Sequence, residues 1–101
     1  MISAARQRNR ARKFDAVLWG ATGFTGQLVA EYLAQHPDRS KGLRWALGGR
    51  SASKLEAVRD DLARINSDCA ELPIVLGDSR DAASMADLAA STEVVCTAVG
   101  P

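Results

Sequence analysis

The chain has 101 residues, of which 47% are hydrophobic and 25% charged, and its formal net charge is +1. A chain of this length holds at most one domain, and this composition is that of a globular protein. No apolar run approaches the ~20 residues of a transmembrane helix, and the amino-terminus lacks the apolar stretch of a secretory signal. We therefore predict a cytoplasmic location.

Positive charge is concentrated at the amino-terminus. Residues 1–13 contain five basic residues and no acidic one, whereas residues 14–101 contain eight basic and twelve acidic ones, a net charge of −4. A nucleic-acid arm or a targeting sequence would be basic too, but no aromatic residue is interleaved with these charges, and the remainder is acidic. We predict a disordered basic tail over residues 1–13, a domain over residues 14–101 and no nucleic-acid partner.

Strand and helix patterns alternate through the rest of the chain. Apolar segments predict four strands, at residues 15–19, 44–48, 72–76 and 93–98. Apolar residues at helical spacing predict three helices, at about residues 24–35, 53–65 and 81–90. Short alternating connections imply parallel strands joined by right-handed crossovers. The predicted fold class is α/β, the amino-terminal βαβαβαβ half of a Rossmann-like doubly wound parallel sheet, with spatial strand order 3-2-1-4.

Local patterns predict how these elements begin and what they bury. A polar loop should follow His36-Pro37, and Ser53 and Glu56 have the spacing of a capping box at the start of the second helix. Cys69 and Cys96 are too far apart in sequence for a metal-binding pair, so both should be free thiols in a reducing compartment, with Cys96 buried in a strand that is covered on both faces. The side chains expected on the buried helix faces are Leu28, Val29, Tyr32, Leu33, Leu55, Val58, Leu62, Ile65, Met85 and Leu88.

A glycine-rich turn, GATGFTG at residues 20–26, joins the first strand to the first helix. Its G-x-x-G-x-x-G spacing differs from the common G-x-G-x-x-G fingerprint, which would have glycine at Ala21. Such a turn brings the backbone close to a phosphate and directs the positive helix end at it. A tight turn without a ligand is the alternative, and the absence of G-x-x-x-x-G-K-[ST] excludes that phosphate loop. The pyrophosphate of a dinucleotide is the expected ligand, bound by Gly20, Thr22, Gly23, Phe24, Thr25 and Gly26.

The choice of cofactor depends on the end of the second predicted strand. An acidic residue there would bind the ribose 2′-hydroxyl of NAD, but the sequence reads Gly48-Gly49-Arg50-Ser51. Arg50 would pair with a 2′-phosphate, Ser51 would add a hydrogen bond, and Lys54 would add charge. NADP(H) is therefore the predicted cofactor.

Later segments complete the predicted site. Asp78 follows the third strand and either accepts a hydrogen bond from the adenine amino group or caps the next helix. Ala98 and Gly100 follow the fourth strand, where the second half of a dinucleotide would pass. The single histidine, His36, stands at a helix end and is interpreted as a surface residue. We identify neither a catalytic residue nor a metal site.

These segments resemble the amino-terminus of saccharopine dehydrogenase-like oxidoreductases, and most closely the bacterial trans-acting enoyl reductase branch. The resemblance covers residues 14–101 and rests on residues 14–26, 45–51, 54–55, 77–78 and 97–101. It implies a longer protein with a second, substrate-binding domain that this chain lacks. It also implies reduction of a double bond in lipid or polyketide precursors, with a lipid-like substrate in the missing part, and leaves a peripheral membrane contact of the parent protein open.

The sequence thus predicts an amino-terminal fragment of an NADP(H)-dependent oxidoreductase, inactive on its own. Two alternatives stay open. A non-catalytic NADP-binding redox sensor would use the same turn, and an extended short-chain reductase or epimerase would carry a Tyr-x-x-x-Lys pair further along.

Overall fold

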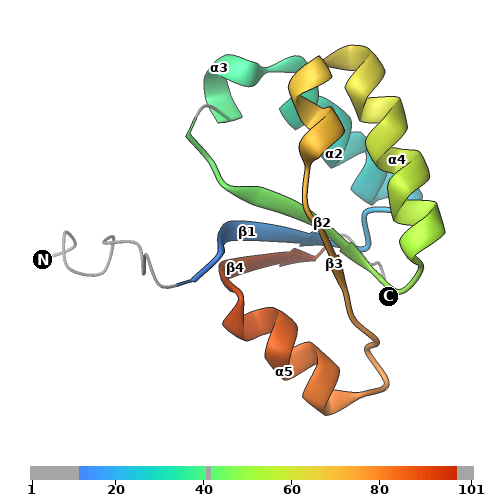
Figure 1. Ribbon diagram of the computed structural model, residues 1–101, viewed down its shortest axis with the longest axis vertical. Coiled ribbons are helices and arrows are strands. Elements are labelled where there is room, and N and C mark those ends of the chain that lie inside the picture. Colours follow the sequence, from blue (N-terminus) through green and yellow to red (C-terminus); the bar gives the residue numbers. More distant parts are fainter. Residues whose placement is uncertain (1–11, 41, 98–101) are drawn as a thin grey trace, which may run out of the picture.

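The computed structural model describes residues 12–40 and 42–97 (Figure 1). Within them, four strands form one parallel sheet in the order β3-β2-β1-β4. The strands are β1 (Phe14–Trp19), β2 (Trp45–Gly49), β3 (Ile74–Leu76) and β4 (Thr92–Thr97). The predicted α/β class, the parallel Rossmann-like sheet and the strand order 3-2-1-4 are confirmed.

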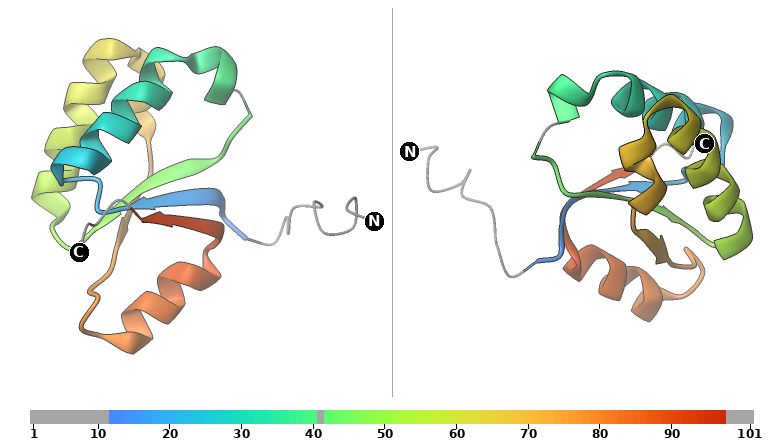
Figure 2. Two further views of the ribbon diagram at one scale, coloured as in Figure 1. Left: turned by 180° about the vertical axis from the view of Figure 1, so that it is seen from behind. Right: turned by 45° about the horizontal axis from the view of Figure 1, so that its top comes forward.

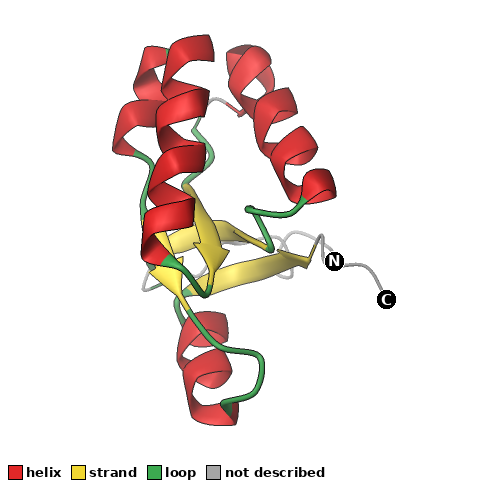
Figure 3. Ribbon diagram, turned by 90° about the vertical axis from the view of Figure 1, so that its right-hand side faces the viewer, coloured by secondary structure: helices red, strands yellow, loops and turns green. Residues whose placement is uncertain are grey.

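Helices cover both faces of this sheet, as the colouring by secondary structure makes plain (Figure 3). They are α2 (Phe24–Gln35), α3 (Pro37–Ser40), α4 (Ala52–Ile65), the 3₁₀ helix η1 (Ser67–Glu71) and α5 (Ala82–Ala90). Figure 2 shows α2 and α4 on one face and α5 on the other. Helix α3 was not predicted: the polar segment after His36 forms a further helical turn, because Pro37 suits the first position of a helix.

The core lies on both sides of β1. Successive strand residues point to opposite faces, so Leu18 packs with Leu47 and Leu55 under α2 and α4, while Val17 packs with Leu88 of α5. The predicted inward positions of α4 and α5 are confirmed for Leu55, Val58, Leu62 and Leu88, all of which are buried. Met85 is partly buried against the cluster that contains Leu88.

Helix α2 turns a different face to the sheet from the one predicted. Its buried residues are Gly26, Ala30 and Ala34, whereas Leu28 and Tyr32 are exposed. Small side chains at this spacing let the helix approach the sheet closely, and the larger apolar residues are displaced to its flanks. Val29 and Leu33 remain partly buried there. Ile65, the last residue of α4, is likewise exposed.

The two cysteines differ in burial, and the prediction for Cys96 is wrong. Cys96 is exposed because β4 is an edge strand, and the structure describes no element that covers its outer side. Most of β4 is exposed for the same reason, so it is not covered on both faces as predicted. Cys69, in η1, is buried, and burial is the main cause that raises the pKa of its thiol, followed by the charge of Asp68.

Helix caps also differ from the predicted ones. Ser51 caps α4 by accepting a hydrogen bond from the Lys54 amide at 3.3 Å, so the cap lies two residues before Ser53, where the capping box was predicted. Asp81 caps α5 by accepting from the amides of Ala83 and Ser84. Asp78 is therefore not the helix cap, and that interpretation is wrong.

Polar contacts join the strands at their amino-terminal ends. Asp15 is buried and bonds Arg44 twice, accepting from its backbone amide at 2.9 Å and from its guanidinium at 3.0 Å. Arg12, which belongs to the predicted tail, donates to the carbonyl of Thr92 at 2.6 Å. Residues 1–11 lie outside the described part.

Among the described helices, none has the length and apolar character to cross a bilayer.

Candidate functional site

The carboxyl ends of the parallel strands meet at one edge of the sheet. Trp19 at the end of β1 is level with Gly48 of β2 and Thr97 of β4, and Gly49 is level with Leu76 of β3. The turns after β1, β2 and β3 therefore emerge side by side. In open parallel sheets, ligands bind at this edge, next to the strands where the winding reverses direction. Here those strands are β1 and β4.

Backbone hydrogen bonds join the glycine turn to β2. The amides of Gly20 and Ala21 donate to the carbonyl of Gly48 at 3.0 and 3.3 Å, and the amide of Gly23 donates to the carbonyl of Gly20 at 3.1 Å. Gly20 has a φ of +85°, a conformation that favours glycine. The chain thus reverses direction directly above the carboxyl end of β1.

Gly26 and Gly23 have different surroundings. A Cβ atom on Gly26 would lie 2.1 Å from the carbonyl oxygen of Gly20, so close packing of α2 on the turn requires glycine there. A Cβ atom on Gly23 would lie 3.5 Å from the same oxygen, an ordinary contact, and Gly23 is exposed. The fold itself therefore has room for a side chain at Gly23, which leaves space beside the turn for a ligand.

The first turn of α2 is suited to an anion. Its first internal hydrogen bond runs from the Gln27 amide to the Gly23 carbonyl, so the amides of residues 24–26 precede the helical ladder. Among the described residues, no side chain caps this end, and no acidic residue stands in the first turn. The side chain of Gln27 donates to the Thr22 carbonyl at 2.8 Å and steadies the turn. The helix dipole thus favours negative charge here without a competing carboxylate.

A cavity of about 390 Å³ opens at the same edge of the sheet. Its walls come from the glycine turn, the start of α4 and the turn after β3. It is lined by Thr22, Arg50, Ser51, Lys54, Gly77, Asp78 and Arg80. Three cationic side chains and one carboxylate therefore surround the cavity.

The structure brings most of the predicted site residues to this edge. Arg50, Ser51, Lys54 and Asp78 line the cavity together with Thr22. Phe24 and Thr25 are exposed at the start of α2, beside the cavity lining rather than in it. Ser51 also serves as the helix cap, and its hydroxyl lies 3.2 Å from that of Ser53. Ala98 and Gly100 lie outside the described residues.

Sequence reasoning missed Arg80. Its backbone amide and its Nε donate to Asp78 Oδ1 at 2.9 and 3.1 Å, and its Nη2 donates to Oδ2 at 3.1 Å. These bonds to Arg80 are the main cause that lowers the pKa of Asp78, and the charge of Arg50 contributes less. An acidic residue two positions before a basic one, in a turn after a strand, was the available signal.

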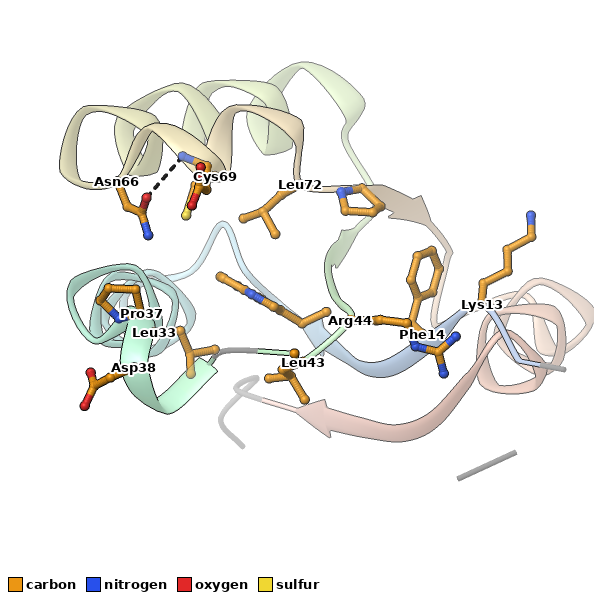
Figure 4. Close-up of a pocket in the computed structure, with 14 residues that line it drawn as sticks. Lys13, Phe14, Leu33, Pro37, Asp38, Leu43, Arg44, Asn66, Cys69 and Leu72 are labelled. Carbon is orange, nitrogen blue, oxygen red and sulfur yellow. Dashed lines mark hydrogen bonds between the residues drawn. The ribbon is translucent and has the colours of Figure 1, made fainter. Parts of the chain in front are cut away.

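A larger cavity, of about 830 Å³, lies at the opposite edge of the sheet, near the beginnings of β1 and β2 (Figure 4). Leu33, Leu43 and Leu72 are among its apolar lining residues, and buried Cys69 borders it. The glycine turn contributes nothing to this lining. Among the described residues, no group of three or more histidine, cysteine or acidic side chains could hold a metal ion. The smaller cavity is the candidate site, because the glycine turn and three cationic side chains line it.

Comparison with known proteins yields several similar chains. A protein named trans-acting enoyl reductase from Mycobacterium ulcerans (strain Agy99) is 43% identical over 90 residues, which are 89% of this chain and 20% of that protein. One of the same name from Mycobacterium tuberculosis (strain ATCC 25618 / H37Rv) is 41% identical over the same shares. A lipid droplet localized protein from Caenorhabditis elegans is 38% identical over 88% of this chain and 21% of its own length. The chain thus spans about a fifth of these relatives. No family model matches it.

Proposed function

We propose that the chain is the NADP(H)-binding portion of an enoyl reductase-type oxidoreductase of the saccharopine dehydrogenase-like kind. One observation carries the proposal. The start of α2 follows the glycine turn and has no acidic residue, and it lies at the same edge of the sheet as a cavity lined by three cationic side chains. A dinucleotide with an added phosphate has charges that suit both places. The names of the Mycobacterium relatives support the reductase class.

Each half of the site has a task in cofactor binding. The turn at residues 20–26 would hold the pyrophosphate against the amides at the start of α2. Arg50 and Lys54 would bind the 2′-phosphate in the cavity, where no aspartate or glutamate stands at the tip of β2 to select NAD. The bound nicotinamide would supply the hydride that reduces an enoyl double bond.

The reaction itself belongs to the remaining part of the protein. We propose a lipid or polyketide precursor as substrate, bound by residues beyond those that this chain shares with its relatives, so that the chain alone has no reductase activity. A peripheral membrane contact of the whole protein stays a prediction, and the name of the Caenorhabditis elegans relative is the observation that favours it.

Titration calorimetry with NADPH and NADH tests the choice of cofactor. NADPH should bind the chain more tightly, by about ten- to a hundredfold, because charge-assisted hydrogen bonds to a phosphate are strong. Arg50→Ala should remove most of that preference and leave NADH affinity nearly unchanged. Equal affinities for the two cofactors in the unmutated chain would contradict the proposal of NADP(H).

Gly23→Val tests the pyrophosphate site. The variant should bind neither cofactor, because a side chain at this position would fill the space that the phosphate needs. The fold should remain, because the added Cβ makes only an ordinary contact with the Gly20 carbonyl. Circular dichroism checks the fold. An intact variant with unchanged affinity would show that the turn binds no phosphate.

A further inference from the structure

Asp78 presents a difficulty for a phosphate site, because its carboxylate lines the same cavity as Arg50 and Lys54. A bare carboxylate there would repel the negatively charged ligand. Arg80 neutralises it through hydrogen bonds from its amide, its Nε and its Nη2. With Arg80 counted, the charged side chains of the cavity sum to +2, which matches a phosphomonoester of about −1.5 to −2 at neutral pH.

The hydrogen bonds between Arg80 and Asp78 use only part of the Arg80 guanidinium. A guanidinium carries five N–H groups, and Asp78 receives only the one on Nε and one on Nη2. The remaining N–H groups form a fork of the kind that matches phosphate oxygens. Arg80 is therefore held at one side of its guanidinium, while the other side donates no hydrogen bond to any residue that the structure describes.

The Asp78–Arg80 pair contributes little to stability, because both side chains are accessible: the Arg80 side chain is 77% exposed and that of Asp78 36%. It does restrict the position of a flexible side chain. The Asp78 amide donates to the Ser84 hydroxyl at 2.9 Å, which ties this turn to α5. The guanidinium is thus attached through Asp78 to a helix of the fold.

We propose that Arg80 is a specificity-determining residue for 2′-phosphorylated adenine nucleotides, and that Asp78 is the positioning residue that holds its guanidinium at the cavity. The proposal rests on the function proposed above. Arg50, Lys54 and Arg80 surround the 2′-phosphate from three places: the tip of β2, the first turn of α4 and the turn after β3.

The test is calorimetric titration of the full chain with adenosine 2′,5′-bisphosphate and with 5′-AMP, two probes that differ only in the 2′-phosphate. Arg80→Gln should weaken binding of the bisphosphate about tenfold and leave 5′-AMP binding unchanged. Arg64→Gln is the matched control, because Arg64 forms a similar exposed pair with Asp61 away from the cavity, at 3.4 Å. It should change neither affinity.

Asp78→Ala separates positioning from plain electrostatics. Removal of a negative charge should strengthen phosphate binding if charge alone matters. If Asp78 positions Arg80, the ratio of bisphosphate to 5′-AMP affinity should instead fall, by severalfold. A ratio that rises or stays constant would overturn the positioning role. Thermal melting of each variant verifies that the exposed substitutions leave the fold intact.

The outcomes distinguish this inference from the proposed function. A chain that prefers the bisphosphate, with the same preference in Arg80→Gln, would overturn the role of Arg80 and leave the NADP(H) proposal in place. A chain that binds both probes equally, or neither, would overturn both.

Discussion

At the scale of the residue, the glycines of the turn differ in what the fold requires of them. Gly20 adopts a positive φ, Gly26 has a carbonyl oxygen 2.1 Å from where its Cβ would be, and Gly23 is subject to neither restriction. We predict that Gly26→Ala lowers the free energy of unfolding by about 2–3 kcal/mol, since an overpacked contact must be relieved by moving α2. Urea denaturation measures the change.

Gly23→Ala is the control for that experiment, because its added methyl group meets the same Gly20 carbonyl at an ordinary distance. Its free energy of unfolding should stay within about 0.5 kcal/mol of the unmutated value, as is usual for exposed positions. Equal losses in the two variants would mean that α2 does not approach the turn as closely as described.

At the scale of the element, the starts of α4 and α5 each depend on one capping side chain. Asp81 caps α5 by accepting two backbone amides, at 3.1 and 3.3 Å. Asp81→Ala should lower the free energy of unfolding by about 1 kcal/mol, the usual cost of a lost cap. Asp87→Ala removes an equal charge from an exposed position further along the same helix and should cost little. The prediction fails if thermal melting ranks the two variants in the opposite order.

At the scale of the whole molecule, β4 leaves an apolar edge open. Val94 is 57% exposed and Val95 38%, and within the described residues β4 pairs only with β1. Edges of this kind associate with one another. The 101-residue chain should therefore self-associate, and Val94→Lys should raise the monomer fraction measured by light scattering, because a charged edge residue opposes strand pairing.

Leu28→Lys is the control for the edge. Leu28 is 50% exposed on α2 and therefore offers a similar apolar area away from any strand. If association requires the strand edge, this variant should associate as the unmutated chain does. A chain that is monomeric without any substitution would contradict the prediction.

The sequence by itself determined the order of the four strands and the three longer helices, and the place of the turn. Strand and helix periodicities are local properties, and Gly20 and Gly26 report requirements of the turn itself, a positive φ and a close approach to the Gly20 carbonyl. The parallel strand order followed as well, because short crossovers permit few arrangements. Arg50, Lys54 and Asp78 could be placed at one edge because they follow the ends of parallel strands.

Only the tertiary structure decided which surfaces are covered and which charges meet. Leu28 and Tyr32 gave α2 an apolar stripe, yet the residues that the helix buries are Gly26, Ala30 and Ala34, and the first of them packs against the Gly20 carbonyl too closely for a side chain. The exposure of Cys96 depends on whether another element lies beyond β4. The apolar residues next to Cys96 in the sequence do not indicate whether such an element is present. The partner of Asp78 was likewise open from sequence: a carboxylate after a strand bonds a helix amide, a ligand or an arginine equally well, and the path of the turn selects Arg80.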